Sequence, residues 1–411
     1  MNCSKTALWL CLWLVPLQCV TDNSTLKSTK PLVELAKLQS LPVKITPVKR
    51  KMRTGKLKNA ETLPQVYNKT NLSTFTLPHI NQALTDALRQ QLKLLKRRKQ
   101  NYTQRFSNLS LNLSDLETTI ELLTLWQETY PQGLVEHLNA YQLKGQDGKG
   151  NVKFTGYFTP EIEVSKRKTK QFKYPIYAYP KGWEGPLPTR KEIDGKQQVL
   201  KGKGLELAYA KRLEDIYYMQ LQGSGLVRYP NGERSYFGFA GSNRHPYSSI
   251  GKHIKDNEDI RLKNISVDGV KRYLKIRPDM VEPILFTNPS YVFFKASKKE
   301  PLGAGHVSLT ADYSIAVDIN HLPLGSCLLA ALPVTDEEGN FSHHRYQFVV
   351  AQDVGGAIRG NGHVDFYCGI GEEGKRKAMA MHHYGQLWLL LPKPAEEIGP
   401  VLSEAAWSEK D

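Results

Sequence analysis

After residue 150 the sequence changes to short apolar or alternating runs between glycine, proline and asparagine residues, and this pattern restricts the fold most. Alternation with a period of two is typical of β-strands, and Gly, Pro and Asn favour the turns that join them. The clearest runs are residues 152–158, 291–295, 314–319, 346–351 and 386–391. Because the chain has neither a strand-helix-strand rhythm nor an internal repeat, we expect a mainly β body made of barrels.

Two helical patterns precede this β region. Apolar residues recur at helical spacing ahead of the basic cluster at 96–99 and predict an amphipathic helix; they are Ile80, Leu84, Leu88, Leu92 and Leu95. A second helix is expected to begin at Ser114, where Glu117 completes a capping box, and to end at Tyr130-Pro131. We expect this second helix to mark the start of the folded body.

The net charge of +16 is concentrated in one part of the chain. Residues 21–110 hold 18 Lys and Arg against 4 Asp and Glu, whereas residues 111–411 hold 37 against 36. The body is therefore almost neutral, which argues against nucleic acid as a partner. Two interpretations of the basic segment stay open: an arm that touches lipid headgroups or an acidic wall polymer, and a solvated tail.

The first residues have the features of an export signal. Residues 6–17 form an apolar run behind Lys5 that is too short to span a bilayer comfortably. Cys19 closes this run and resembles the lipidated cysteine of bacterial lipoproteins, although Gln18 fits poorly where a small residue is wanted. Only Cys327 and Cys368 follow, which is too few for a disulfide framework, and both pairing and free thiols stay open.

A glycine-rich segment at 352–369 carries two carboxylates, Asp353 and Asp365, each at the edge of an apolar run. A carboxyl group can deliver the proton that cleavage of a glycosidic bond requires. Glycine lets a ligand approach the backbone closely, but such segments are also ordinary turns. The residues by themselves leave both interpretations open.

Several motifs occur in an order that resembles the family of the membrane-bound lytic murein transglycosylase A, over roughly residues 105–393. They are FTGYFTP at 154–160, MQLQGSG at 219–225, AGSNRHPYSSIG at 240–251, NPSYVFF at 288–294, AVD at 316–318, QDVGGAIRGNGHVDFYCG at 352–369 and HYG at 383–385. The resemblance implies cleavage of the β-1,4 bond between N-acetylmuramic acid and N-acetylglucosamine in peptidoglycan. It further implies 1,6-anhydromuramyl ends and no cofactor.

By the same resemblance the catalytic carboxyl falls on Asp365, and Asp318 and Asp353 match two further aspartates that support the site. The muramyl residue carries its own nucleophile, a 6-hydroxyl, so that one carboxyl group can serve as acid and then as base. This double role requires a raised pKa, which burial of Asp365 would provide. Candidate sugar contacts in the matched segments, each equally open to a structural role, are Thr155, Tyr157, Gln222, Ser224, Asn243 and Tyr247.

The resemblance implies a double-psi β-barrel formed by both ends of the body, with a second β-barrel domain inserted between them. We expect a signal at 1–19, a basic tether at 20–78, helices and the first part of the barrel at 79–159, the insert at 160–298, the rest of the barrel at 299–393 and a tail at 394–411. Peptidoglycan strands would be the partner, and the enzyme would lie in the periplasm, attached to the outer membrane.

The chain departs from the family pattern in three places. Arg244 stands where a glycine is usual, Cys368 lies beside the catalytic segment, and the basic arm is unusually long. The glycines at 156, 223 and 225 are expected to allow tight turns rather than to bind a ligand.

Other signals are weaker. Residues 369–374 match a dinucleotide-binding fingerprint but lack the following strand and acid, and a second Asp-Thr/Ser-Gly that an aspartic peptidase needs is absent from the sequence. No metal-ligand spacing connects His306, His363 and the pair at 382–383, which we interpret as surface or turn histidines. Two alternatives remain: a peptidoglycan hydrolase that uses water, and a non-catalytic wall-binding protein.

Overall fold

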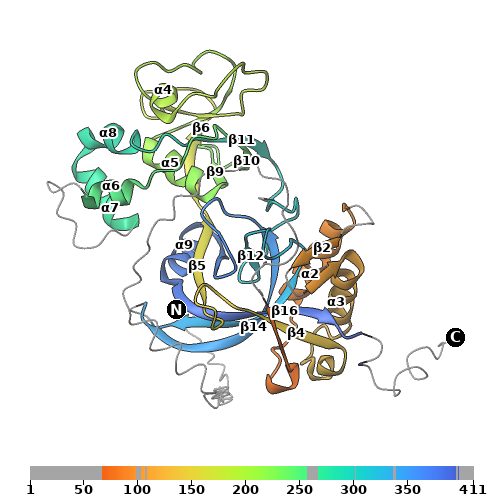
Figure 1. Cartoon of the computed structure of the whole chain (residues 1–411). Coiled ribbons are helices and arrows are strands. Elements are labelled where there is room, and N and C mark those ends of the chain that lie inside the picture. Colours follow the sequence, from red (N-terminus) through yellow and green to blue (C-terminus); the bar gives the residue numbers. More distant parts are fainter. Residues whose placement is uncertain are drawn as a thin grey trace, which may run out of the picture.

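The computed structural model describes residues 67–98, 103–106, 109–256, 267–300, 302–336, 339–394 and 397. The signal at 1–19, Cys19, the tether before residue 67 and most of the tail after residue 394 lie outside these residues. Figure 1 shows two β-structures, one above the other, with helices at the side of the lower one. Within the described residues, no helix has both the length and the apolar character that crossing a membrane requires.

The larger sheet has eight strands in the order β1-β4-β16-β13-β14-β12-β15-β5. A further pairing between β16 and β5 closes the last six of them into a barrel. The strands are β1 (Tyr67–Thr70), β4 (Leu138–Leu143), β5 (Val152–Thr159), β12 (Ser314–Ala316), β13 (Cys327–Thr335), β14 (Phe341–Asp353), β15 (His363–Ile370) and β16 (His382–Pro392). Phe154, Val349 and Leu389 are fully buried in the core that this barrel encloses.

A second sheet has the order β11-β10-β9-β6-β8-β7. Its strands are β6 (Glu161–Ser165), β7 (Tyr174–Tyr177), β8 (Glu206–Ala210), β9 (Gly225–Arg228), β10 (Arg234–Ser242) and β11 (Val292–Ser297). An isolated bridge between Ala178 and Phe294 brings its two edges together. The chain thus leaves the first barrel after β5 and returns at β12, which confirms the prediction of a mainly β chain with an inserted second β-barrel. The boundaries at 160 and 298 stay predictions.

Helices cover both sheets. The helices of the insert are α4 (Arg190–Asp194), α5 (Leu213–Gln222), α6 (Ile250–Asp256), α7 (Val267–Ile276) and α8 (Val281–Leu285). The first barrel carries α2 (Gln82–Leu95), α3 (Leu113–Leu125) and α9 (Gly371–Ala380), and a hairpin of β2 (Thr103–Phe106) and β3 (Leu109–Asn112) lies between α2 and α3. Short 3-10 turns occur at η1 (Leu72–Thr74), η2 (Gln132–Glu136) and η3 (Pro278–Met280).

The two predicted N-terminal helices are present, but the limits of the second one were wrong. Helix α3 is capped by Asn112, whose backbone N–H donates to the Asp115 carboxylate at 2.8 Å, so Asn112 and Asp115 form the capping box in place of Ser114 and Glu117. The helix ends at Leu125, before Tyr130. Asn caps a helix as well as Ser does, and two overlapping capping patterns in the sequence hid the true start.

Two of the matched glycines have different physical roles. Gly223 ends α5 with a φ of +78°, a left-handed conformation that glycine adopts without strain. Gly156 lies in the middle of β5 and makes no turn; an added Cβ would approach the Ala378 Cα of α9 to 2.6 Å. The expectation of a turn at Gly156 was therefore wrong, because this glycine lets α9 pack directly on the strand.

A fully buried arginine holds the insert together. Arg190 donates hydrogen bonds to Gln220 Oε1 at 2.6 Å, Ser290 O at 2.7 Å and Asn288 O at 3.3 Å. It forms an ion pair with the buried Asp194 at 3.6 Å. Its guanidinium lies over two aromatic rings, those of Tyr217 and Tyr291. Because these acceptors and Asp194 pair with Arg190 inside the insert, its loss would leave buried polar groups without that partner.

We therefore expect Arg190→Met to lower the free energy of unfolding by about 3–5 kcal/mol, the usual cost of removing one partner from a buried ion pair. Urea unfolding followed by tryptophan fluorescence would measure the loss. Arg277→Met is the matched control, since the Arg277–Asp279 pair is exposed and solvent screening leaves it a much smaller effect on the free energy of unfolding. Equal losses in both variants would contradict the assignment of Arg190.

Candidate functional site

Strands β5 and β15 bring six side chains to one face of the barrel. The two strands run parallel, with Thr155 beside Asp365 in the register. Alternate residues of a strand point to the same face. The six residues that share this face are Lys153, Thr155 and Tyr157 on β5 and His363, Asp365 and Tyr367 on β15. Residues that are about 210 positions apart in the sequence thus form one polar cluster.

Among the described residues, one side-chain hydrogen bond holds Asp365 in this cluster. The Thr155 hydroxyl donates to Asp365 Oδ1 at 2.8 Å. Burial raises the pKa of Asp365 to about 6, the Thr155 hydrogen bond lowers it, and the charge of Asp353 raises it further. A carboxyl group with this pKa can give up a proton and take one back near neutral pH.

His363 is the residue that sequence reasoning missed. Its Nε2 lies 2.9 Å from the Thr155 hydroxyl oxygen. Since that hydroxyl uses its one proton toward Asp365, the imidazole is the donor, and a chain of hydrogen bonds runs from His363 through Thr155 to Asp365. Burial lowers the pKa of His363 to about 4, with smaller effects from Lys153 and His382, so the ring is neutral near pH 7.

The expectation of a surface or turn histidine at position 363 was therefore wrong. His363 lies half-buried in β15, two residues before Asp365, and this spacing is the signal that could have found it. His382 lies opposite Thr155 on β16, on the other side of β5 from β15. Within the described residues, no group of three or more His, Cys, Asp or Glu side chains is arranged to hold a metal ion.

Asp353 lies two strands away from Asp365, across β12, at the end of β14. The Tyr157 hydroxyl donates to its Oδ2 at 2.9 Å, and the backbone N–H groups of Ala304 and Val354 donate to its Oδ1 at 2.8 and 2.9 Å. Burial raises the pKa of Asp353 against these three bonds, which lower it. The Asp353 carboxylate thereby holds both the Tyr157 side chain and the backbone at Ala304 in place through hydrogen bonds.

Asp318 follows β12 and is buried. Its Oδ2 accepts the Gly360 N–H at 2.9 Å, and its Oδ1 accepts the backbone and side-chain N–H groups of Asn320 at 3.0 and 2.8 Å. Burial would raise the pKa of Asp318, but these hydrogen bonds outweigh burial and the pKa is lowered. Asp318 therefore anchors the glycine-rich segment that leads into β15, away from Asp365 itself.

The remaining predicted residues are divided between the barrel and the insert. Gln222, at the end of α5, accepts the Phe158 N–H at 3.0 Å and so connects the insert to β5, and Ser224 follows it, half-buried. Asn243 is buried, and the partners of its side chain among the described residues are backbone groups, those of Pro188, Pro289, Tyr291 and His245. This geometry leaves Asn243 no free atom for a sugar and gives it a structural role.

Tyr247 and Arg244 lie on the surface of the insert near Asn243. Tyr247 is 56% exposed, an unusual degree for an aromatic ring, and can offer a flat face to a sugar. Arg244 has a φ of +62°, in the left-handed region that favours glycine. The backbone here thus has the conformation that makes glycine usual at this position, and the chain tolerates an arginine in it.

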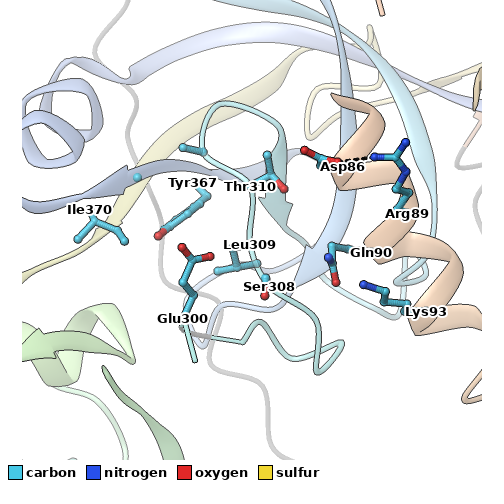
Figure 2. A pocket seen from close by; sticks show the side chains of 12 residues that line it. Asp86, Arg89, Gln90, Lys93, Glu300, Ser308, Leu309, Thr310, Tyr367 and Ile370 are labelled. Atoms are coloured by element: carbon cyan, nitrogen blue, oxygen red, sulfur yellow. Dashed lines mark hydrogen bonds and ion pairs between the residues drawn. The ribbon is translucent and has the colours of Figure 1, made fainter. Parts of the chain in front are cut away.

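A cavity of about 700 Å³ lies close to this cluster, between α2, the segment 308–311 and the end of β15 (Figure 2). Tyr367 lines it, whereas Asp365 does not. The ring of Tyr367 lies 5.2 Å from that of Tyr157 between centroids, and the Tyr157 hydroxyl donates to Asp353. Cys368 and Cys327 are buried and free, and burial raises the pKa of Cys368 to about 12.

Two family models match this chain: the MltA specific insert domain at residues 153–295 and the 3D domain at residues 313–391. Membrane-bound lytic murein transglycosylase A of Escherichia coli K12 is 38% identical over 261 residues, which are 62% of this chain and 70% of that protein. The homolog of Buchnera aphidicola is 40% identical over 259 residues, again 62% and 70%.

Solved structures agree with the sequence comparisons. The crystal structure of E. coli MltA with bound chitohexaose is similar with a TM-score of 0.67 at 30% identity, covering 85% of this chain and all of that one. MltA from Neisseria gonorrhoeae, in its monoclinic form, gives a TM-score of 0.62 at 25% identity, covering 79% of this chain and 92% of that one. This chain therefore belongs to the membrane-bound lytic murein transglycosylase A family.

Proposed function

We propose that this chain is a peptidoglycan lytic transglycosylase in which Asp365 is the only acid and base. Its relatives are named lytic murein transglycosylases, which supports the reaction class. The observation that carries the residue assignment is a buried carboxyl with a pKa of about 6 on a barrel strand, hydrogen-bonded at one oxygen only among the described residues.

In the proposed reaction, protonated Asp365 gives its proton to the glycosidic oxygen as the bond between the muramyl C1 and that oxygen breaks. Positive charge develops at C1, as in other glycosidic cleavages. The Asp365 carboxylate then accepts the proton of the muramyl 6-hydroxyl, while the oxygen of that hydroxyl bonds to C1. A 1,6-anhydro ring forms, Asp365 is protonated again, and no water is consumed.

The hydrogen-bond chain has a defined task in this scheme. Thr155 donates to Oδ1 of Asp365, and this bond places the acidic proton on Oδ2, the oxygen free to face a sugar. His363 supplies the proton donor that fixes the Thr155 hydroxyl in this direction. Both residues act as positioning groups, so that Asp365 transfers its proton from one orientation.

A hydrolase that inverts at the anomeric carbon would need a second carboxylate to activate water. Asp353 is the nearest such group, but three hydrogen bonds occupy both of its oxygens. The alternative of a wall-binding protein without activity is disfavoured because the relatives are named as lytic transglycosylases. We therefore favour the transglycosylase over both alternatives.

The glycan strand is proposed to lie along the face that carries Thr155 and Tyr157 and to reach Gln222, Ser224 and Tyr247 on the insert. The bound chitohexaose of the E. coli relative supports a glycan as the ligand class. We further propose that the protein acts in the periplasm, held at the outer membrane through Cys19 and its basic arm. The name of the relatives, membrane-bound, supports attachment to an envelope membrane.

Asp365→Asn is expected to lower the release of muropeptides from purified sacculi by about 10³-fold or more, because an amide can neither give nor take the proton. Mass spectrometry should identify the products of the parent enzyme as anhydromuropeptides, one water lighter than the reducing forms. Asp279→Asn on the exposed side of the insert is the matched control and should behave as the parent. Reducing products, or full activity in Asp365→Asn, would refute the mechanism.

The pH profile provides a separate test of the hydrogen bond. The reaction begins with protonated Asp365, so kcat/KM should fall as pH rises through about 6. Thr155→Val removes a bond that favours the charged carboxylate; the pKa of Asp365 then rises, and the inflection moves to higher pH. Thr155→Ser keeps the bond and should leave the inflection in place. A shift to lower pH in Thr155→Val would contradict this role of Thr155.

A further inference from the structure

The cavity between α2 and β15 takes no part in the proposed reaction, although it is lined by a residue of the same strand as Asp365. Tyr367, in its wall, is two residues beyond Asp365 and on the same face of β15. A strand rises by about 3.3 Å per residue, so the cavity begins roughly 7 Å from the acid. Its volume of about 700 Å³ is that of a typical small-ligand site.

The charges around the cavity do not all neutralise each other. Arg89 and Asp86, both on α2, form an ion pair at 2.7 Å. Lys93, one turn further along α2, and Glu300 make no ion pair within the described residues. Figure 2 shows Lys93 on the α2 side and Glu300 on the side of Tyr367. The cavity thus presents one unpaired cation and one unpaired anion on different walls.

The rest of the lining combines hydrogen-bonding and apolar groups. Ser308 and Thr310 contribute hydroxyls, and Leu309 and Ile370 contribute alkyl side chains. Hydroxyls can bond the amide groups of a peptide, and the alkyl groups suit short side chains such as a methyl group. A neutral sugar would use the hydroxyls but neither the isolated cation nor the isolated anion.

We propose that this cavity binds the stem peptide that the muramyl residue carries on its lactyl group. The inference rests on the proposed function, because the muramyl residue at Asp365 is what brings the peptide to the cavity. A carboxylate of the peptide would pair with Lys93. A free ammonium, present in stems that contain a diamino acid, would pair with Glu300. The cavity would thereby distinguish peptide-bearing glycan from bare glycan.

The test compares two substrates: glycan strands with tetrapeptide stems, and the same strands after an amidase has removed the peptides. We expect Lys93→Glu to lower kcat/KM about fivefold on peptide-bearing strands, the size typical of one exposed charge pair, and to leave bare strands unaffected. Lys96→Glu is the matched control, since Lys96 follows α2 as its cap, is exposed and lies outside the cavity lining. It should change neither value.

A charge reversal on the other wall gives a second, independent readout. Glu300→Lys should lower kcat/KM on stems with a free amine and should have no effect once that amine is acetylated. The proposal is overturned if either variant changes both substrates equally or changes neither. If the parent enzyme forms no anhydromuramyl ends from peptide-bearing strands, the proposed function fails instead, so the two failures are distinguishable.

Discussion

The parallel pairing of β5 with β15 is the constraint on which the site depends. It places Thr155 against Asp365, and one short hydrogen bond between them joins the part of the barrel that precedes the insert to the part that follows it. Burial of this pair raises the pKa of the acid, and the alternation of both strands brings His363 and Tyr157 to the same face. The register between β5 and β15 thus sets the positions of the side chains around Asp365 and, through burial, the pKa of its carboxyl group.

The three aspartates differ in what surrounds them, although they look alike in the sequence. Asp318 accepts three N–H groups and has a lowered pKa, so it stays charged and fixes a loop. Asp353 is buried and accepts three donors, which commits both of its oxygens. Within the part of the chain that the structure describes, Asp365 accepts one side-chain donor, at Oδ1, and its Oδ2 has no hydrogen-bond partner. The proposed acid thus differs from the two proposed supporting residues in the number of hydrogen bonds that its carboxylate accepts.

The local sequence pattern was sufficient to predict the helices and strands that bury one face. The run at 152–158 corresponds to β5, and the leucine residues before residue 96 lie in α2. Both were predictable because the apolar residues recur with the period of a strand and of a helix, respectively. Strand β15 was not predicted: its segment was interpreted as a glycine-rich loop, since only pairing with β5 and β12 makes it a strand. β14 begins at Phe341, five residues before its predicted start, because polar residues mask its first part.

The resemblance to a family was sufficient to predict Asp365 as the catalytic residue. It did not predict the roles of the neighbouring residues. His363 was overlooked because its partner, Thr155, is more than two hundred residues away in the sequence. Asn243 was left open between a sugar contact and a structural role, because the sequence does not show that its amide is buried and bonded to the backbone. Burial and hydrogen-bond partners, which the sequence does not contain, decide both cases.

The position of the insert has a consequence for how the chain acquires its structure. Strand β5 is made early, yet its partners β15 and β16 come only after the whole insert. Until then β5 has unpaired edges, which are prone to associate with other chains. The insert has its own hydrophobic core and can fold first, so that β5 is still without its partner strands when the insert is already folded. Closure of the barrel, and with it the assembly of the cluster around Asp365, therefore requires contacts between residues far apart in the sequence, which form slowly.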